Sequence, residues 1–275
     1  MTKDEILKMA EKLYQEAFDA NSYYLIMKQY GQNYNDYESE VQLSPAFYQT
    51  IFNALQNACF MELAKLYDKS NDVFSIGVLI KGCQESISLF SEYRRTLKEE
   101  FEGQEYTSQI PYQHELKPEE ECFFKEQVRS QREILRLFDM TSANMSPIRV
   151  DLKFSEFLDL YYKRFCALSK KQKNLRVQRN KIYAHNDMDK LSDVDEILKK
   201  NPICYADIQE LTDFALDVTR LIIGCLTGIC KPDKYVNIED WKNTLRTAEL
   251  GLKYQDYDIE QRMKEFREQL SSQKE

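Results

Sequence analysis

The sequence predicts an all-α protein, built as a bundle of long antiparallel helices. Apolar residues recur at steps of three and four along most of the chain, which is the spacing of an amphipathic helix. The 275 residues include 7 glycines and 6 prolines, which is few for the many turns of a β-rich protein. We find neither an internal repeat nor a β-hairpin signal. These observations together favour a helical bundle.

The N-terminal part, residues 1–140, is predicted to form a first group of helices. These helices are expected at about 3–30, 45–67, 75–101 and 118–139. Ser44 and Pro45 mark the start of the second predicted helix, because serine caps a helix N-terminus and proline fits the first turn of a helix. Ser75 is expected to cap the third helix, and the glutamates after Pro118 favour the start of the fourth.

Residues 140–152 are predicted to separate this group from a second one, residues 153–230. A regular apolar stripe begins near Leu158, but Gln172 and Arg179 take positions in it that packing alone would make apolar. Another helix is expected from about 205 to 229. The remaining segment, residues 237–275, is predicted to form a charged helical tail that contains the sole tryptophan, Trp241.

The composition argues against several classes of protein. A net charge of −8 is unfavourable for nonspecific binding of nucleic acid over the whole surface. No apolar run approaches the roughly 20 residues of a membrane span, and the charged N-terminus does not resemble a signal peptide. The 7 cysteines form no C-x-x-C pair. We therefore expect mostly buried, reduced thiols in a cytoplasmic protein without membrane attachment.

The motifs of the common enzyme classes are absent from the sequence. It contains no Gly-rich phosphate loop, no G-x-S-x-G, no H-E-x-x-H and no EF-hand loop. With 2 histidines in total, a histidine-rich metal centre is excluded. We expect no metal or other cofactor.

A strongly basic run interrupts this acidic chain at residues 163–181. It has eight cations and no acid among nineteen residues: Lys163, Arg164, Lys170, Lys171, Lys173, Arg176, Arg179 and Lys181. Such a run is typical either of a solvated outer helix face or of a surface that contacts RNA phosphates.

The run leads into "RNKIYAH" at 179–185, which resembles the R-polar-x4-H motif of the HEPN superfamily. The stretch "NACFMELAKLYDKSNDVFSIGVLI" (57–80) is similar to the second and third helices of the abortive-infection, AbiU-like branch of that superfamily. In that branch a helix ends in a Leu/Tyr/Asp turn and a serine caps the next helix. The resemblance extends over roughly residues 1–230 in layout, and it implies an all-α HEPN fold of the kind found in RNA-cleaving toxins and antiviral abortive-infection proteins.

The resemblance implies a metal-independent endoribonuclease that works as a homodimer and cleaves RNA by attack of the 2′-hydroxyl. Arg179 and His185 are the expected catalytic residues, with Asn180 in support. On an α-helix six residues turn through about 600°, which leaves Arg179 and His185 roughly 120° apart. One copy therefore does not clamp a phosphate alone, whereas two copies supply two arginines and two histidines.

Each expected side chain suits its role chemically. A histidine with a pKa near 6.5 moves protons at neutral pH, and an arginine holds a phosphate through a bidentate fork. Four further residues are expected to contact RNA: Arg176, Lys181, Lys173 and Tyr183. Tyr183 either stacks on a base or packs inside the protein.

Other interpretations of these residues stay open at this point. Arg179 is also explained as a solvated arginine or as an ion pair across the bundle, and His185 as a histidine that favours a helix C-terminus. The same fold also suits a non-catalytic module that binds a nucleotide, RNA or a protein, or a relative that has lost its chemistry.

The resemblance also admits an antitoxin or other regulatory protein as a partner. Some family members carry, two residues after the histidine, a tyrosine that a partner nucleotidyltransferase modifies. Asp187 stands at that position here, so we do not expect this modification.

Overall fold

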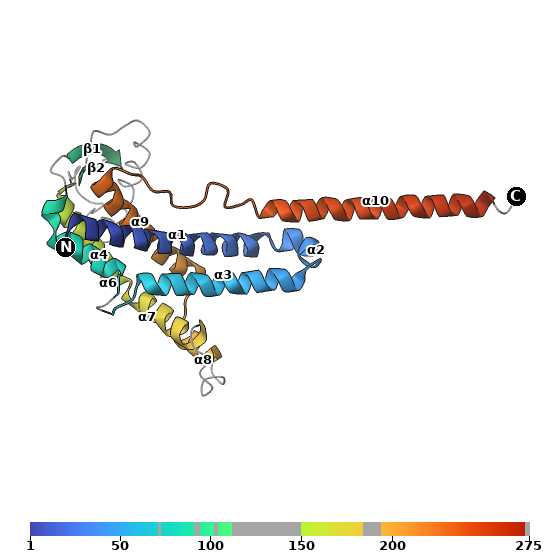
Figure 1. Ribbon diagram of the computed structural model, residues 1–275, viewed down its shortest axis with the longest axis horizontal. Coiled ribbons are helices and arrows are strands. Elements are labelled where there is room, and N and C mark those ends of the chain that lie inside the picture. The colour runs from blue at the N-terminus through green and yellow to red at the C-terminus, as the bar shows by residue number, and fades with distance from the viewer. Residues whose placement is uncertain (71–72, 91–93, 102–103, 112–149, 184–193, 273–275) are drawn as a thin grey trace. The chain divides into compact units, whose positions relative to one another are not determined.

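The computed structural model of the chain (Figure 1) describes residues 1–70, 73–90, 94–101, 104–111, 150–183 and 194–272. The helix predicted at 118–139, most of the break predicted at 140–152, and both histidines lie outside the described residues. Packing divides the chain into two units. The first comprises residues 1–24 and 57–234, and the second comprises residues 25–56 and 235–275.

The first unit is built mainly from helices, as the sequence predicted. They are α1 (Lys3–Asn33), α3 (Pro45–Leu66), α4 (Ile76–Glu85), α6 (Phe154–Ala167), α7 (Ser169–Gln178), α8 (Val194–Lys200) and α9 (Tyr205–Thr227), of which α1 and α3 extend into the second unit. Within this unit α1 and α3 run side by side in opposite directions (Figure 1), and the Cys59 thiol donates to the Ala20 carbonyl at 3.6 Å. Leu13, Leu63 and Ile222 are fully buried in the core. The helical bundle is therefore confirmed.

Local signals set several helix ends where the sequence placed them. Helix α3 begins at Pro45, and the backbone N–H of Tyr48 donates to the Ser44 carbonyl at 3.2 Å. Ser75 precedes α4 in an extended conformation, and its carbonyl accepts a hydrogen bond from the backbone N–H of Leu79 in the first turn of that helix. Helix α9 ends at Gly228, whose φ of 74° lies in the left-handed region that glycine adopts without steric cost.

The helix predicted at 75–101 is wrong in its second half. Helix α4 ends at Glu85, and a 3₁₀ turn (Ile87–Leu89) leads toward strand β1 (Arg94–Phe101). Strand β2 (Gln104–Pro111) lies between two of the predicted helices and pairs with β1 in antiparallel orientation. Strand β3 (Val150–Leu152) lies parallel to β2. A three-stranded sheet of order β1-β2-β3 thus accompanies the bundle.

The reason for this difference lies at the end of α4. The backbone dihedral angles of Ser86, φ −115° and ψ 33°, are no longer helical, although its N–H still donates to the Gly82 carbonyl. Beyond it, the ladder pairs Phe101 with Gln104, so two residues, Glu102 and Gly103, connect the strands. A two-residue connection containing glycine is typical of a hairpin, and the prediction of a helix up to residue 101 missed this signal.

The helix predicted after residue 155 is interrupted at Leu168, where α6 ends and α7 begins. Leu168 has φ −75° and ψ 1°. The amide of Gln172 donates to the Phe165 carbonyl at 2.7 Å, one of the carbonyls that a helix end leaves without a backbone partner. Gln172 is 1% exposed. Its place in an otherwise apolar stripe is therefore explained by the break itself.

The second unit contains the end of α1, a 3₁₀ turn (Asn35–Tyr37), α2 (Glu38–Val41), the start of α3, and α10 (Lys242–Ser272). The indole N–H of Trp241 donates to the Gln29 side chain at 2.7 Å, and its ring lies 6.2 Å from that of Tyr30. Helix α10 contacts α2. Near the beginning of α10, Leu245 is buried. The predicted tail is thus one long helix with an anchored N-terminal end.

None of the helices in the described ranges combines the length and the apolar character needed to cross a bilayer.

The buried hydroxyl of Tyr67 gives a test of the bundle. It donates to the Leu211 carbonyl at 2.5 Å, and the residue is fully buried. We expect Tyr67→Phe to lower the free energy of unfolding by about 1 kcal/mol, because the bond is lost and no volume is removed. Urea unfolding followed by circular dichroism measures it. Tyr254→Phe, at a tyrosine that is 70% exposed, is the control and is expected to change nothing.

Candidate active site

Arg179 begins a π-helical turn, Arg179–Tyr183, that directly follows α7. A π turn takes in more residues than an α turn and often occurs at functional sites. The angular separation calculated for Arg179 and His185 on an α-helix therefore does not apply here. His185 lies outside the described residues.

Polar side chains on α7 fix the segment that leads to this turn. The amide of Gln178 donates to the Asn201 carbonyl at 2.6 Å, and that of Asn174 donates to the Pro202 carbonyl at 2.9 Å. Both side chains are buried, so they satisfy carbonyls in the link between α8 and α9 that would otherwise lack partners. Helix α7 is held in place by hydrogen bonds as well as by its apolar contacts.

Arg179 lies beside Asp68, with Nη2 3.6 Å from Oδ2. Asp68 follows the end of α3, and its Oδ1 accepts the backbone N–H and the hydroxyl of Ser70 at 2.9 and 2.8 Å. The hydrogen bond from the Ser70 N–H lowers the pKa of Asp68, and so does the nearby guanidinium. Partial burial acts in the opposite direction, but its effect is smaller. Arg179 thus forms an ion pair with Asp68, which is one of the alternatives that the sequence left open.

This contact joins the two stretches that resemble HEPN proteins. Asp68 belongs to "KLYDKS" in the stretch 57–80, and Arg179 begins "RNKIYAH". Sequence analysis did not select Asp68 as a site residue, although the Leu/Tyr/Asp turn that contains it was the available signal. The pairing of the two segments required the tertiary structure.

Two arginine donors remain buried and without a hydrogen bond next to this pair. They are Nε of Arg176 and Nε of Arg179, three residues apart along the helix. An unpaired buried donor is unfavourable, and donors this close on one helix face suit an anionic ligand. The Arg179 side chain as a whole is 23% exposed, so it is only partly buried.

The remaining predicted residues fall into two groups. Asn180, Lys181 and Lys173 are exposed on α7 and the π turn. Tyr183 packs against Phe60 of α3, with ring centroids 4.6 Å apart, and burial raises the pKa of its hydroxyl. Tyr183 therefore packs inside the protein, and its contact with RNA stays a prediction.

Acids from other elements balance part of the basic run. Arg164 pairs with Glu210 of α9, and Lys171 pairs with Glu210 and with Asp207, the latter at 2.6 Å. In the described part of the chain, five cations of the run form no ion pair with an acid: Lys163, Lys170, Lys173, Arg176 and Lys181. The α6 and α7 surface is thus less basic than the sequence alone suggested, and its uncompensated charge is concentrated toward the π turn.

A hollow of about 280 Å³ lies beside Asp68. Its lining consists of Lys12, Glu16, Lys65, Asp68, Val73 and Phe74. Lys12 Nζ lies 5.7 Å from the centroid of the half-exposed Phe74 ring. Two further cations and an accessible aromatic ring therefore lie near the Asp68–Arg179 pair.

The buried thiols do not suit a catalytic nucleophile. Cys59 and Cys83 are buried, which raises the pKa of each to about 12 and keeps them protonated. Cys166 and Cys204 are exposed, so burial is less general than the sequence predicted. No set of three or more candidate metal ligands comes together among the residues that the structure describes.

A family model described as AbiU2, of the HEPN_AbiU2 family, matches residues 3–244. The chain belongs to the HEPN AbiU2 family. Its abortive-infection relationship, inferred from two short stretches, is therefore confirmed across most of its length. Neither the curated proteins nor the solved structures contain a match to this AbiU2-family chain.

Asp207 gives a pH-dependent test of the charge pairing in the AbiU2-family protein. Although partial burial opposes it, bonds from Lys171 and Cys204 lower the pKa of Asp207 from 3.8 to about 2. Ionised Asp207 therefore stabilises the fold fully above pH 3.8, and this stabilisation is lost as the pH falls through about 2. We expect Asp207→Asn to cost about 1 kcal/mol at pH 7, since it also weakens the N-terminal cap of α9.

Urea unfolding at pH 7 and pH 3 measures this difference. The wild type and Asp207→Asn are expected to be closer in stability at pH 3. Asp256→Asn, at an exposed aspartate of α10, is the matched control. An Asp207→Asn effect that is equal at both values of pH contradicts the assignment.

Proposed function

We propose that this protein is a metal-independent endoribonuclease of toxin or abortive-infection type. One observation carries the proposal: Arg176, in the last turn of α7, and Arg179, at the start of the π turn, have buried, unpaired donors beside a surface of uncompensated cations. Membership of the HEPN AbiU2 family supports it. RNA is the expected substrate because its phosphates match the cations and its 2′-hydroxyl supplies an internal nucleophile.

The reaction follows from the chemistry of the two motif residues. The 2′-oxygen of RNA bonds to the adjacent phosphorus, and the bond from phosphorus to the 5′-oxygen breaks. His185 accepts the proton of the 2′-hydroxyl, and a second His185, from the other copy, donates a proton to the leaving oxygen. Arg179 stabilises the charge that develops on the phosphoryl oxygens, and the products are a 2′,3′-cyclic phosphate and a 5′-hydroxyl.

A homodimer is part of the proposal because this reaction uses one base and one acid. Each chain has His185 as the sole histidine of its motif. A two-fold axis near the motif brings both histidines and both arginines to one phosphodiester. Asn180, exposed beside Arg179, then orients the phosphate or the histidine.

Asp68 acts as a positioning residue in this scheme. Its carboxylate lies 3.6 Å from one nitrogen of the Arg179 guanidinium, a distance at which the charges attract without a tight hydrogen bond. The arginine is held near its working position, where its guanidinium is the proposed contact for phosphate. The Ser70 donors keep Asp68 itself in place.

The decisive test uses purified protein, total RNA and tRNA in the presence of EDTA. We expect the wild type to cleave RNA and leave 2′,3′-cyclic phosphate ends. His185→Ala removes the group that transfers the protons, so the cleavage rate is expected to fall by roughly 10²–10⁴-fold. Cleavage rates and end-group analysis measure both results.

The matched control is His114→Ala, which removes the other histidine of the chain and is expected to cleave like the wild type. Equal cleavage by the wild type and His185→Ala rejects the assignment of His185. RNA binding without cleavage by either protein favours instead a non-catalytic module on the same fold.

The uncompensated cations are tested through the salt dependence of RNA binding. Lys173→Ala and Lys181→Ala are each expected to lower the slope of log affinity against log salt by about 0.7, the share of one phosphate contact on a single strand. Titrations use His185→Ala protein and single-stranded RNA. Lys264→Ala, at an exposed lysine of α10, is the control, and an unchanged slope in both test variants rejects these contacts.

A further inference from the structure

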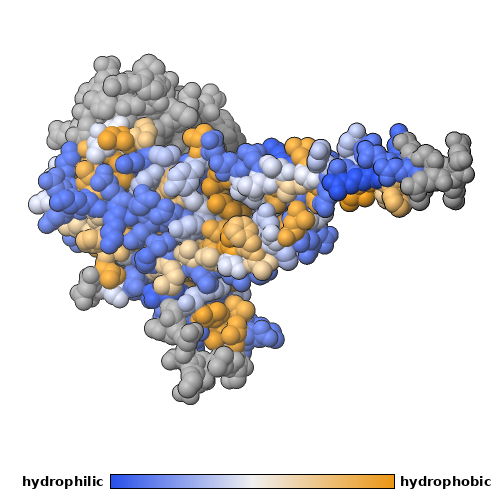
Figure 2. Space-filling view, turned by 45° about the vertical axis from the view of Figure 1, so that its right-hand side comes forward, coloured by the Kyte–Doolittle hydropathy of each residue, from blue (hydrophilic) through white to orange (hydrophobic). Residues whose placement is uncertain are grey.

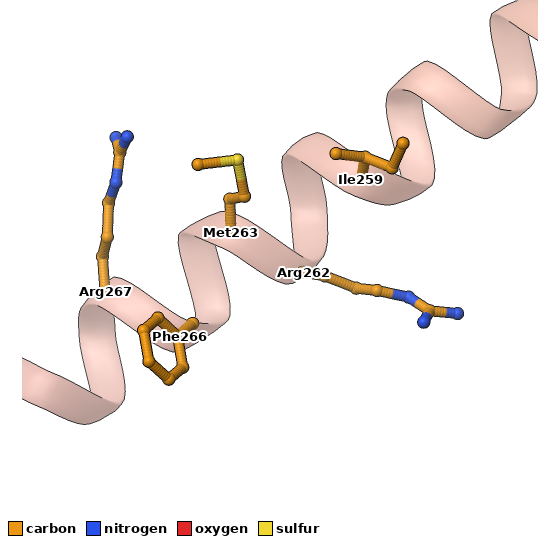
Figure 3. Close-up of a pocket in the computed structure, with 5 residues that line it drawn as sticks. All are labelled: Ile259, Arg262, Met263, Phe266 and Arg267. Carbon is orange, nitrogen blue, oxygen red and sulfur yellow. The ribbon is translucent and has the colours of Figure 1, made fainter.

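Helix α10 carries an apolar stripe that the described chain leaves exposed. Ile259, Met263 and Phe266 are 48%, 52% and 61% exposed, and they follow one another at steps of four and three residues. Figure 3 shows them on successive turns, with the guanidinium groups of Arg262 and Arg267 extending in different directions. Together these five residues line a shallow hollow on a single helix.

An exposed stripe of this kind marks an interaction surface. Steps of four and three are the spacing of the core positions in a coiled coil. Most of the stability of a helix in a protein comes from packing its apolar face. Toward the right of Figure 2, hydrophobic residues of α10 (orange) are exposed beside hydrophilic ones (blue). A second helix laid along this stripe would bury it.

The charges beside the stripe favour one orientation of such a partner. In a heptad with Met263 and Phe266 at core positions, Glu260, Arg262 and Arg267 take the flanking positions. Two parallel copies in register would place Arg262 opposite Arg267 of the partner subunit, and these two cations repel. Two antiparallel copies would place Glu260 opposite Arg267 of the partner subunit, and by symmetry this attraction occurs twice.

The two charges that make this pair are available for it. Among the residues that the structure describes, neither Glu260 nor Arg267 forms an ion pair, whereas Arg262 is paired with Asp258 at 3.0 Å. Another exposed stripe on α10, formed by Leu250, Tyr254 and Tyr257, lacks this charge pattern. The 259–267 face is therefore complementary to itself.

We propose that α10 binds α10 of a second copy in antiparallel orientation, with Met263 packed against Phe266 of the partner subunit. The interface lies in the second packing unit, whereas Arg179 belongs to the first. It is therefore additional to the motif-centred homodimer, and it does not depend on nuclease activity. If both interfaces form, the protein assembles beyond a dimer.

A charge-reversal series on the full-length protein tests the proposal by sedimentation equilibrium. Glu260→Arg and Arg267→Glu each place like charges opposite one another at two points, so each is expected to weaken association by about tenfold. The double variant restores opposite charges and is expected to associate like the wild type. Met263→Asp is expected to abolish this association step, because it introduces two carboxylates into the apolar seam.

The matched control is Glu265→Arg, which reverses a charge on the outward face of the same helix and is expected to leave the mass unchanged. Circular dichroism of each variant verifies that the helix content is retained. An unchanged mass in both single variants overturns the proposal, and so does stronger association of Arg267→Glu, which indicates parallel helices. Since no RNA is added, failure here is distinct from failure of the nuclease assignment.

Discussion

Two consecutive residues after the end of α3 join distant parts of the first unit, and the candidate site depends on them. Tyr67 is fully buried and donates to the Leu211 carbonyl of α9, and Asp68 lies beside Arg179 on the π turn. The hydroxyl bond fixes the end of α3 against α9, most of whose residues are buried. The carboxylate next to it then reaches the arginine that begins the HEPN motif.

Helix α7 contributes to the same arrangement through buried polar contacts. Gln172 satisfies a carbonyl freed by the break at Leu168, while Asn174 and Gln178 satisfy carbonyls in the link to α9. Such bonds require specific partners at specific distances, so they fix the register of α7 more narrowly than apolar packing does. In α7 and the π turn, Nε of Arg176, Nε of Arg179 and Oε1 of Gln172 remain buried without hydrogen-bond partners. The two arginine donors are the ones that the proposed function assigns to a ligand.

The distribution of charge separates structural cations from available ones. Lys171 and Arg164 are bound to carboxylates of α9 and hold α6 and α7 against it. Lys173 and Lys181 are exposed without such acids in the described chain. A net acidic protein thus keeps a local cationic surface on α7 and the π turn.

The sequence by itself determined the helical class, the starts of α3 and α4, the end of α9 and the HEPN relationship. These features depend on short-range chemistry, such as Pro45 in a first turn or Gly228 with a positive φ. The tertiary structure alone decided the sheet at 94–111, the break at Leu168 and the partners of Lys171 and Arg179. Each of these is set by groups far away in the chain: β3 pairs with β2 across about forty residues, and Asp68 precedes Arg179 by more than one hundred. Periodicity records which face of a segment is buried, but it carries no record of which distant atoms lie against it.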